Sequence, residues 1–348
     1  MSSEFNPSTL LEPRSWSDGQ PELSVVLPAY QEAGVLPSLL PRLLVALRGL
    51  GVEWEVVIVD DGSTDGTWSV VEGAARADGR VRGVRLSRNF GHQAALSAGL
   101  SIARGGAVIT MDSDLQHPPE VIPALLAKAR EGNDVVYAVR SSVDSAGWFK
   151  RRSASLFYRL LNRMTALDLP EGAADFRFMS RRVVDALLAM PERGRFLRGM
   201  TRWVGFRQTT IEYDRAQRGA GRSKYTVRHM LRFAWDAMTA FSSFPLRIAS
   251  SIGVLASILG GIYLVYVLAA RLFSHSVVPG WTSVTAAVIF FSGVQLICFG
   301  LMGQYIGRIY DEAKGRPIFI VADDTAGVPD GRDGNAAVTG TAQLDTTY

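Results

Sequence analysis

The sequence predicts an α/β fold with a mostly parallel, doubly wound sheet, followed by two apolar helices that could cross a membrane. Three observations predict it. Short β-branched runs alternate with helical periodicity over residues 23–139, which is typical of a parallel sheet covered by helices. Uncharged stretches follow at residues 248–270 and 282–307. A strongly basic block, residues 148–232, separates the two regions.

Apolar runs predict the strands, in chain order at residues 23–28, 55–60, 81–86, 107–112 and 134–139. Apolar residues at helical spacing predict the intervening helices, at residues 34–50, 65–77, 94–103 and 119–131. Pro119 stands at the start of the last helix, where its missing N–H removes no hydrogen bond. Because ligands of such sheets bind outside the carboxyl ends of the strands, the polar residues that follow the strands are the first candidates for a site.

The two uncharged stretches are long enough to be membrane helices. At about 1.5 Å per residue, residues 248–270 reach roughly 34 Å, which exceeds the roughly 30 Å core of a bilayer. Glycines in both stretches permit close helix contacts and predict a homo-oligomer. Arg271 alone lies in the connecting loop, whereas four cations flank the other ends: Arg247, Arg308, Lys314 and Arg316. The positive-inside rule therefore predicts a multi-pass protein of the plasma or inner membrane, with its large domain and both termini in the cytoplasm.

These features divide the chain into five parts. The prediction is a disordered leader (1–22), a cytoplasmic sheet domain (23–222), a juxtamembrane amphipathic segment (223–247), two transmembrane helices (248–308), and a cytoplasmic tail with a disordered end (309–348). The only cysteine is Cys298, which excludes an internal disulfide and hence a disulfide-stapled scaffold.

The net charge of +4 conceals a strong asymmetry. Residues 1–147 hold 12 basic and 18 acidic side chains, whereas residues 148–232 hold 19 basic and 7 acidic ones. Because the basic block directly precedes the apolar region, a bilayer surface or a lipid phosphate fits it better than nucleic acid does. No nucleic-acid partner is therefore predicted.

Acidic residues follow two of the predicted strands. Asp112 and Asp114 come at the end of the fourth strand, and Asp60 and Asp61 at the end of the second. Paired carboxylates suit a hard cation, Mg²⁺ or Mn²⁺, that is shared with substrate phosphates. The first strand is not followed by G-x-G-x-x-G, and the sequence holds no G-x-x-x-x-G-K-[ST], which disfavours a dinucleotide-dependent oxidoreductase and a P-loop NTPase.

Together these motifs resemble family 2 glycosyltransferases of the GT-A fold, and more narrowly the polyprenyl-phosphate glycosyltransferases. The motifs are P-A-Y-Q-E (28–32), D-D-G-S-x-D (60–65), S-R-N-F-G (87–91), M-D-S-D-L-Q-H-P-P-E (111–120) and G-R-S-K-Y (221–225). The resemblance spans about residues 23–320 and implies a Rossmann-like GT-A sheet, amphipathic interface helices and two C-terminal transmembrane helices. It also implies an inverting transfer of a sugar from a nucleotide-sugar, UDP-glucose being favoured, to undecaprenyl phosphate. A GDP-mannose-dependent mannose synthase is the alternative.

The resemblance also implies roles for single residues. Asp112 and Asp114 match the metal-binding pair, with Gln116 beside them, and Asp175 matches the proposed catalytic base. Because a phosphate monoester loses its second proton near pH 6, an acceptor phosphate is already mostly dianionic at about pH 7. Asp175 could therefore instead position the reactants or have a purely structural role. The implied donor-binding residues are Pro28, Tyr30, Glu32, Asp60, Asp61, Arg88 and Asp112.

Cations are required for the acceptor phosphate, because planar guanidinium groups bind phosphate through paired hydrogen bonds. The candidates for binding this phosphate are the cations Arg140, Arg152, Arg177, Arg222 and Lys224, together with the hydroxyl residue Ser223 between the last two. His92 is predicted to be structural. A processive polysaccharide synthase is disfavoured, because a Q-x-x-R-W segment and further spans are absent from the sequence. A non-catalytic nucleotide-sugar-binding membrane scaffold is the rival from another class of protein.

Overall fold

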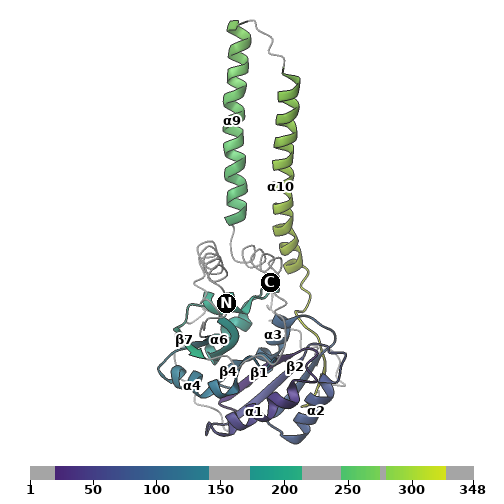
Figure 1. Ribbon diagram of the computed structural model, residues 1–348, viewed down its shortest axis with the longest axis vertical. Coiled ribbons are helices and arrows are strands. Elements are labelled where there is room, and N and C mark those ends of the chain that lie inside the picture. Colours follow the sequence, from purple (N-terminus) through teal and green to yellow (C-terminus); the bar gives the residue numbers. More distant parts are fainter. Residues whose placement is uncertain (1–19, 141–172, 214–243, 275–279, 327–348) are drawn as a thin grey trace, which may run out of the picture. The chain divides into compact units, whose positions relative to one another are not determined.

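The computed structural model describes residues 20–140, 173–213, 244–274 and 280–326 (Figure 1). These residues belong to two compact units. One is built on a sheet and includes residues 317–326, and the other consists mainly of two long helices. Arg152, Arg222, Ser223 and Lys224 lie outside the described residues, so their predicted role in binding the acceptor stays a prediction.

The sheet has eight strands in the order β7-β5-β6-β4-β1-β2-β3-β8. Its centre, β4-β1-β2-β3, is parallel, whereas β6 runs antiparallel between β4 and β5, and β8 runs antiparallel along β3. The mostly parallel α/β sheet is thus confirmed. The strands are β1 (Leu23–Ala29), β2 (Trp54–Asp60), β3 (Val81–Leu86), β4 (Ala107–Thr110), β5 (Val135–Arg140), β6 (Ala173–Ser180), β7 (Gln208–Tyr213) and β8 (Val321–Asp324).

Helices cover both faces of the sheet, as a doubly wound fold requires. Leucines of α1 pack with Val71 of α2 and Leu125 of α4 against one face, which presents Val25 and Ile58. On the other face α3 packs so closely that a Cβ at Gly99 would lie 2.3 Å from Val26. The helices are α1 (Leu36–Arg48), α2 (Thr67–Ala77), α3 (His92–Ile102), α4 (Ile122–Arg130), α6 (Arg181–Ala189) and α7 (Leu197–Trp203), and a 3₁₀ turn covers Pro119–Val121.

The strand β4 ends at Thr110, two residues before the predicted boundary. The N–H of Met111 still donates to the carbonyl of Val26 on β1. The next N–H, that of Asp112, donates instead to the side chain of His117, at 3.0 Å. A side chain therefore takes over from the neighbouring strand as the hydrogen-bond acceptor, which turns the chain out of the sheet at Asp112.

The second unit contains α9 (Phe244–Ser274) and α10 (Trp281–Ala313), which contact each other. Among the described residues one helix stretch, Phe290–Ala313, is long and apolar enough to cross a membrane. The apolar part of α9 is shorter, Ala249–Tyr263. One candidate membrane helix is therefore supported, and the expectation of two is supported only in part.

The turn after β2 depends on a glycine. Gly62 has φ +67°, and a Cβ there would lie 2.4 Å from the carbonyl carbon of Arg88. We expect Gly62→Ala to destabilise the sheet unit by at least about 2 kcal/mol, because both the backbone angle and the contact oppose a side chain. Thermal unfolding of the full chain, followed by tryptophan fluorescence, measures this loss.

Gly73 is the matched control. It is an exposed residue inside α2, and a Cβ added to it would meet nothing within 4 Å. Gly73→Ala is therefore expected to stabilise the helix by about 0.5–1 kcal/mol. If both substitutions changed the stability in the same direction, the close approach of the Arg88 backbone to Gly62 would be contradicted.

Candidate active site

The polar turns that follow β1, β2 and β4 meet at one edge of the sheet. The strands β4, β1 and β2 are parallel neighbours, so their carboxyl ends lie side by side. The hydroxyl of Ser113, after β4, donates to the carbonyl of Pro28 on β1, at 2.9 Å. The N–H of Gln31, after β1, donates to the hydroxyl of Ser63, after β2, at 3.0 Å. The turns therefore form one connected surface.

A possible metal site lies at this edge. His92 at the start of α3, Asp112 after β4 and Asp175 on β6 each offer a ligand atom, and these atoms lie within 4.8 Å of one another. The Nε2 atom of His92 lies 3.4 Å from Oδ1 of Asp112 and 3.2 Å from Oδ2 of Asp175. His92 was predicted to be structural, but the fold places it among the carboxylates.

The environment of Asp112 fits a bound cation. Burial, followed by repulsion from Asp175 and Asp114, raises the pKa of Asp112 to about 6, although the neighbouring His92 opposes this. Its Oδ1 atom is buried and has no hydrogen-bond partner among the residues that the structure describes. A buried carboxylate oxygen without a donor is stabilised by a cation. Carboxylate and imidazole ligands suit Mn²⁺ and, with substrate oxygens added, Mg²⁺.

Asp114, the second member of the predicted metal pair, lies outside this cluster. It is exposed, and its carboxylate accepts hydrogen bonds from the backbone N–H of Gln116, at 3.0 Å, and from the Gln116 side-chain amide. Leu115 between them has a positive φ of 60°, which bends the chain sharply. The roles predicted for Asp114 and Gln116 stay predictions.

Asp175 is buried and surrounded by cations. Arg198 of α7 donates to both of its oxygens, at 3.0 and 2.8 Å, and Arg177 of β6 donates to Oδ1. Burial raises the pKa of this carboxyl, but the hydrogen bond with His92 and the two guanidinium charges outweigh burial and hold its pKa well below the usual range. A carboxylate that stays ionised so readily accepts a proton poorly. This favours a positioning role for Asp175 over the role of catalytic base.

Asp61 fixes the loop that leads into α3. Its two carboxylate oxygens accept hydrogen bonds from the N–H groups of Phe90 and Gly91, at 2.7 and 2.9 Å. Burial raises the pKa of Asp61, and these two bonds oppose the increase. Because His92 directly follows Gly91, this carboxylate sets where His92 stands. Among the described residues, Asp61 thus supports the metal cluster by holding the loop before His92. It also lies among the residues that are predicted to bind the donor.

The other predicted donor residues line the same edge. Asp60 is fully buried: one oxygen accepts the N–H of Ser63 at 3.0 Å, and the other lies 3.5 Å from Nε of Arg85. Tyr30 is 45% exposed, which leaves it accessible for stacking on a base. Arg88 lies with its guanidinium carbon 4.0 Å from the ring centre of Phe90.

Glu32, after β1, has a strongly shifted acidity. Burial, and to a smaller extent repulsion from nearby aspartates led by Asp114, raises the pKa of Glu32 from 4.5 to about 7. The folded protein therefore favours the neutral carboxyl. The stability that this preference contributes is complete below pH 4.5 and is lost as the pH rises through about 7.

We therefore expect Glu32→Gln, which is neutral at every pH, to be more stable than the wild type at about pH 8. The expected rise in melting temperature is about 2–4 °C, which corresponds to roughly 1 kcal/mol, and it should vanish near pH 4.5. Melting curves at the two pH values, recorded without divalent cations, measure it. Glu72→Gln on α2 is the control, and a rise of equal size at both pH values would contradict the shifted pKa.

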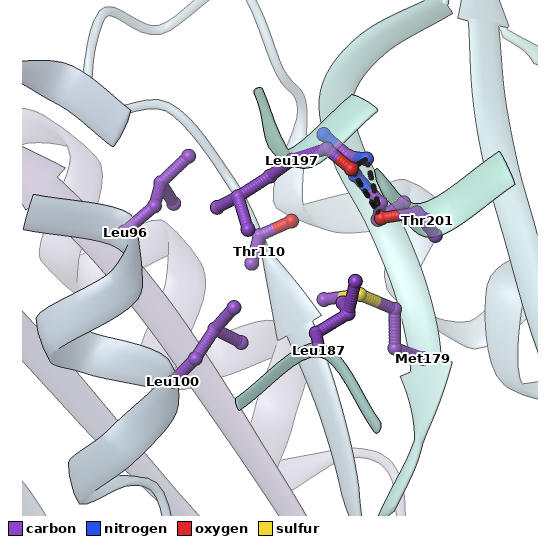
Figure 2. Close-up of a pocket in the computed structure, with 8 residues that line it drawn as sticks. Leu96, Leu100, Thr110, Met179, Leu187, Leu197 and Thr201 are labelled. Carbon is purple, nitrogen blue, oxygen red and sulfur yellow. Dashed lines mark hydrogen bonds between the residues drawn. The ribbon is translucent and has the colours of Figure 1, made fainter. Parts of the chain in front are cut away.

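Arg177, predicted to bind the acceptor phosphate, is 1% exposed. Besides Asp175, its guanidinium donates to the carbonyl of Leu197, at 3.3 Å, and to the hydroxyl of Thr201, at 3.1 Å. Arg177 also lines a pocket, whose apolar lining includes Leu96 of α3 and Met179 of β6 (Figure 2). A phosphate would have to displace Asp175 to reach Arg177. Arg140 ends β5, and its side chain lies outside the described structure.

No sequence motif singles out Arg198. It lies within the basic block, among Arg193, Arg195 and Arg202, and its position after a loop carries no motif. Only the packing of α7 beside β6 brings it to Asp175. His92 carried a weak signal, because it directly follows the S-R-N-F-G motif.

Comparison with known proteins extends this picture. The family model described as glycosyl transferase family 2 matches residues 24–188. An uncharacterized glycosyltransferase, YkcC, of Bacillus subtilis is 42% identical over 86% of this chain and 93% of its own length. The SfII prophage-derived bactoprenol glucosyl transferase of Shigella flexneri is 38% identical over 88% of this chain and all of its own. Among solved structures, glucosyl-3-phosphoglycerate synthase of Mycobacterium tuberculosis aligns with 64% of this chain and 77% of its own, at 21% identity and a TM-score of 0.46.

Proposed function

Because the chain belongs to glycosyl transferase family 2, we propose that it transfers glucose from UDP-glucose to a polyprenyl phosphate, with undecaprenyl phosphate as the acceptor. The observation that carries the proposal is the 38% identity with a bactoprenol glucosyl transferase over that protein's whole length. The cluster of His92, Asp112 and Asp175 at the carboxyl edge of the sheet supplies the chemistry. Mannose transfer from GDP-mannose is the alternative outcome.

The proposed reaction is a single displacement. An oxygen of the lipid phosphate attacks the anomeric carbon of the sugar, while the bond between that carbon and the nucleoside diphosphate breaks on the opposite face. The product is a lipid-phosphate monosaccharide with inverted anomeric configuration. A Mg²⁺ or Mn²⁺ ion held by Asp112 and its neighbours would act as a Lewis acid toward the departing diphosphate.

The chain's own residues hold the reactants and balance their charge. Tyr30 offers a face for the base and Glu32 offers oxygens for ribose hydroxyls, whereas the fully buried Asp60 holds the turn after β2 through the N–H of Ser63. Arg198, which is paired with Asp175 and partly exposed, offers positive charge beside the reacting phosphates. Since the acceptor phosphate is mostly dianionic at about pH 7, no residue has to remove its proton. Most of the rate enhancement then comes from positioning and electrostatics.

We further propose that the protein works at a membrane. Residues 290–313 form one candidate membrane helix, and we propose that residues 249–263 of α9 belong to a second. Together they would return the chain to the cytoplasmic side, with the sheet unit facing the cytoplasm, and the glycines of both helices would allow the protein to self-associate in the bilayer. A lipid acceptor explains why such an enzyme needs a membrane anchor.

A donor panel tests the proposal. Purified full-length protein is incubated with undecaprenyl phosphate, Mg²⁺ or Mn²⁺, and UDP-glucose, GDP-mannose or a UDP-linked amino sugar in turn. We expect a lipid-linked product with UDP-glucose. A product that forms only with GDP-mannose would mean that GDP-mannose, and not UDP-glucose, is the donor. If no nucleotide-sugar gives a product, the proposal is overturned and a non-catalytic scaffold is supported.

A further inference from the structure

A second histidine, His117, lies directly beside the metal cluster without joining it. It is fully buried, and its Nδ1 atom accepts the hydrogen bond from the backbone N–H of Asp112 at 3.0 Å. The loop between these two residues is thereby closed on itself. Because Nδ1 accepts a hydrogen bond, the neutral ring carries its proton on Nε2.

The imidazole ring of His117 is fixed by aromatic neighbours from two strands. It stacks on Phe176 of β6, with ring centres 5.2 Å apart and planes inclined by 25°. Tyr213 of β7 meets it edge-on at 6.4 Å, and Phe176 and Tyr213 contact each other at 6.0 Å. Phe176 directly follows Asp175 in the chain, so the same strand holds the ring and carries a member of the metal cluster.

This arrangement determines where the carboxylate of Asp112 points. Asp112 is the first residue after β4 whose N–H has left the neighbouring strand, so the sheet no longer fixes its backbone. His117 replaces the strand as acceptor at that N–H. As a result the side chain of Asp112 is turned toward His92, and its Oδ1 atom lies 3.4 Å from Nε2 of His92.

We propose that His117 is a positioning residue, which holds the backbone of Asp112 so that the Asp112 carboxylate is pre-aligned for the divalent cation. His117 binds neither the cation nor a substrate in this role. The inference rests on the proposed function, since it concerns the cation that the transfer reaction uses. Outer partners that orient the ligands of a metal typically change metal affinity by about 10–100-fold when they are removed.

The test compares three variants of the full chain by titration with Mn²⁺, following the electron paramagnetic resonance signal of the free ion. His117→Phe keeps an aromatic ring for Phe176 and removes the acceptor. His117→Asn places its amide oxygen where Nδ1 stood, whereas His117→Gln places it one carbon further out. Asn and Gln both remove the ring, so their difference reports the position of the acceptor and not the loss of packing.

We expect His117→Phe and His117→Gln to bind Mn²⁺ about 10–100-fold more weakly than the wild type, and His117→Asn to recover most of that loss. Circular dichroism checks that each variant is folded. If His117→Phe fails to fold, the comparison of Asn with Gln decides. Equal affinities in all folded variants would overturn the inference.

Failure of the inference can be told apart from failure of the proposed function. Asp112→Asn is titrated in parallel, and the donor panel is run on the wild type. Wild-type binding that Asp112→Asn abolishes, together with unchanged affinity in the His117 variants, overturns the role of His117 alone. A wild type that neither binds Mn²⁺ nor forms a lipid-linked sugar overturns both.

Discussion

Asp112→Asn is expected to lower kcat/KM by at least about 10³-fold, which corresponds to roughly 4 kcal/mol of transition-state stabilisation. Asp112 is the member of the metal cluster whose buried oxygen has no hydrogen-bond donor among the described residues, and an amide in its place offers the cation no charge. Initial rates with UDP-glucose and saturating Mn²⁺ measure the loss, and Mn²⁺ titration should show weakened binding.

Asp185→Asn is the matched control for this variant. Asp185 lies on α6, its side chain is 55% exposed, and it pairs with Arg181 away from the cluster. It should retain nearly full activity. An Asp112→Asn variant that keeps a tenth or more of wild-type activity would contradict the site. Asp114→Asn belongs in the same series, because an equal loss there would bring Asp114 into the cation site.

Asp175→Asn is expected to lower kcat by about 10²-fold or more, and a double-mutant cycle with Arg198→Gln reveals how. Asp175 and Arg198 share two hydrogen bonds, so each orients the other. If Asp175 acts through Arg198, the double variant should be little worse than the worse single variant. If Asp175 is an independent base, the losses of the two single variants should multiply in the double variant.

Stability must be followed in this cycle, because breaking a buried ion pair can cost about 3–5 kcal/mol. Asp175 is buried beside two guanidinium groups, and Asp175→Asn removes the negative charge that balances Arg177 while leaving its hydrogen bonds to Leu197 and Thr201. Melting temperatures of all variants separate unfolding from a loss of catalysis. Multiplying losses in folded variants would restore the base reading.

The sequence was sufficient for the first five strands of the sheet but not for the other three. Strands β1 to β5 were predictable because most are buried on both faces and read as apolar runs. Strand β6 was not predicted, because Asp175 and Arg177 interrupt its apolar residues. The pairing of these two charges is visible only in three dimensions. Strand β8 was not predicted, because its four residues include two aspartates, one of which pairs with Arg82 of β3.

The candidate site divides in the same way. Asp60, Asp61 and Asp112 were predictable because strand ends in a parallel sheet meet at one edge. His92 and Arg198 were not, because each reaches the site through packing between elements that are distant in the sequence. His117 lies within the motif at 111–120, but its packing against Phe176 and Tyr213 is visible only in three dimensions. The dual use of Asp61, which anchors the loop before His92, is likewise a property of tertiary contacts.

The pairing of β8 with β3 has a consequence for how the protein is made. The ribosome completes β3 early, but the strand that covers its open edge is synthesised only after both apolar helices. Throughout that interval the nascent sheet presents unpaired N–H and C=O groups, which invite pairing with other chains. Arg82 and Arg85 lie on this edge, and their charges would discourage such pairing until Asp323 and Asp324 arrive to neutralise them. The order of synthesis thus makes completion of the sheet wait for completion of the helical segment.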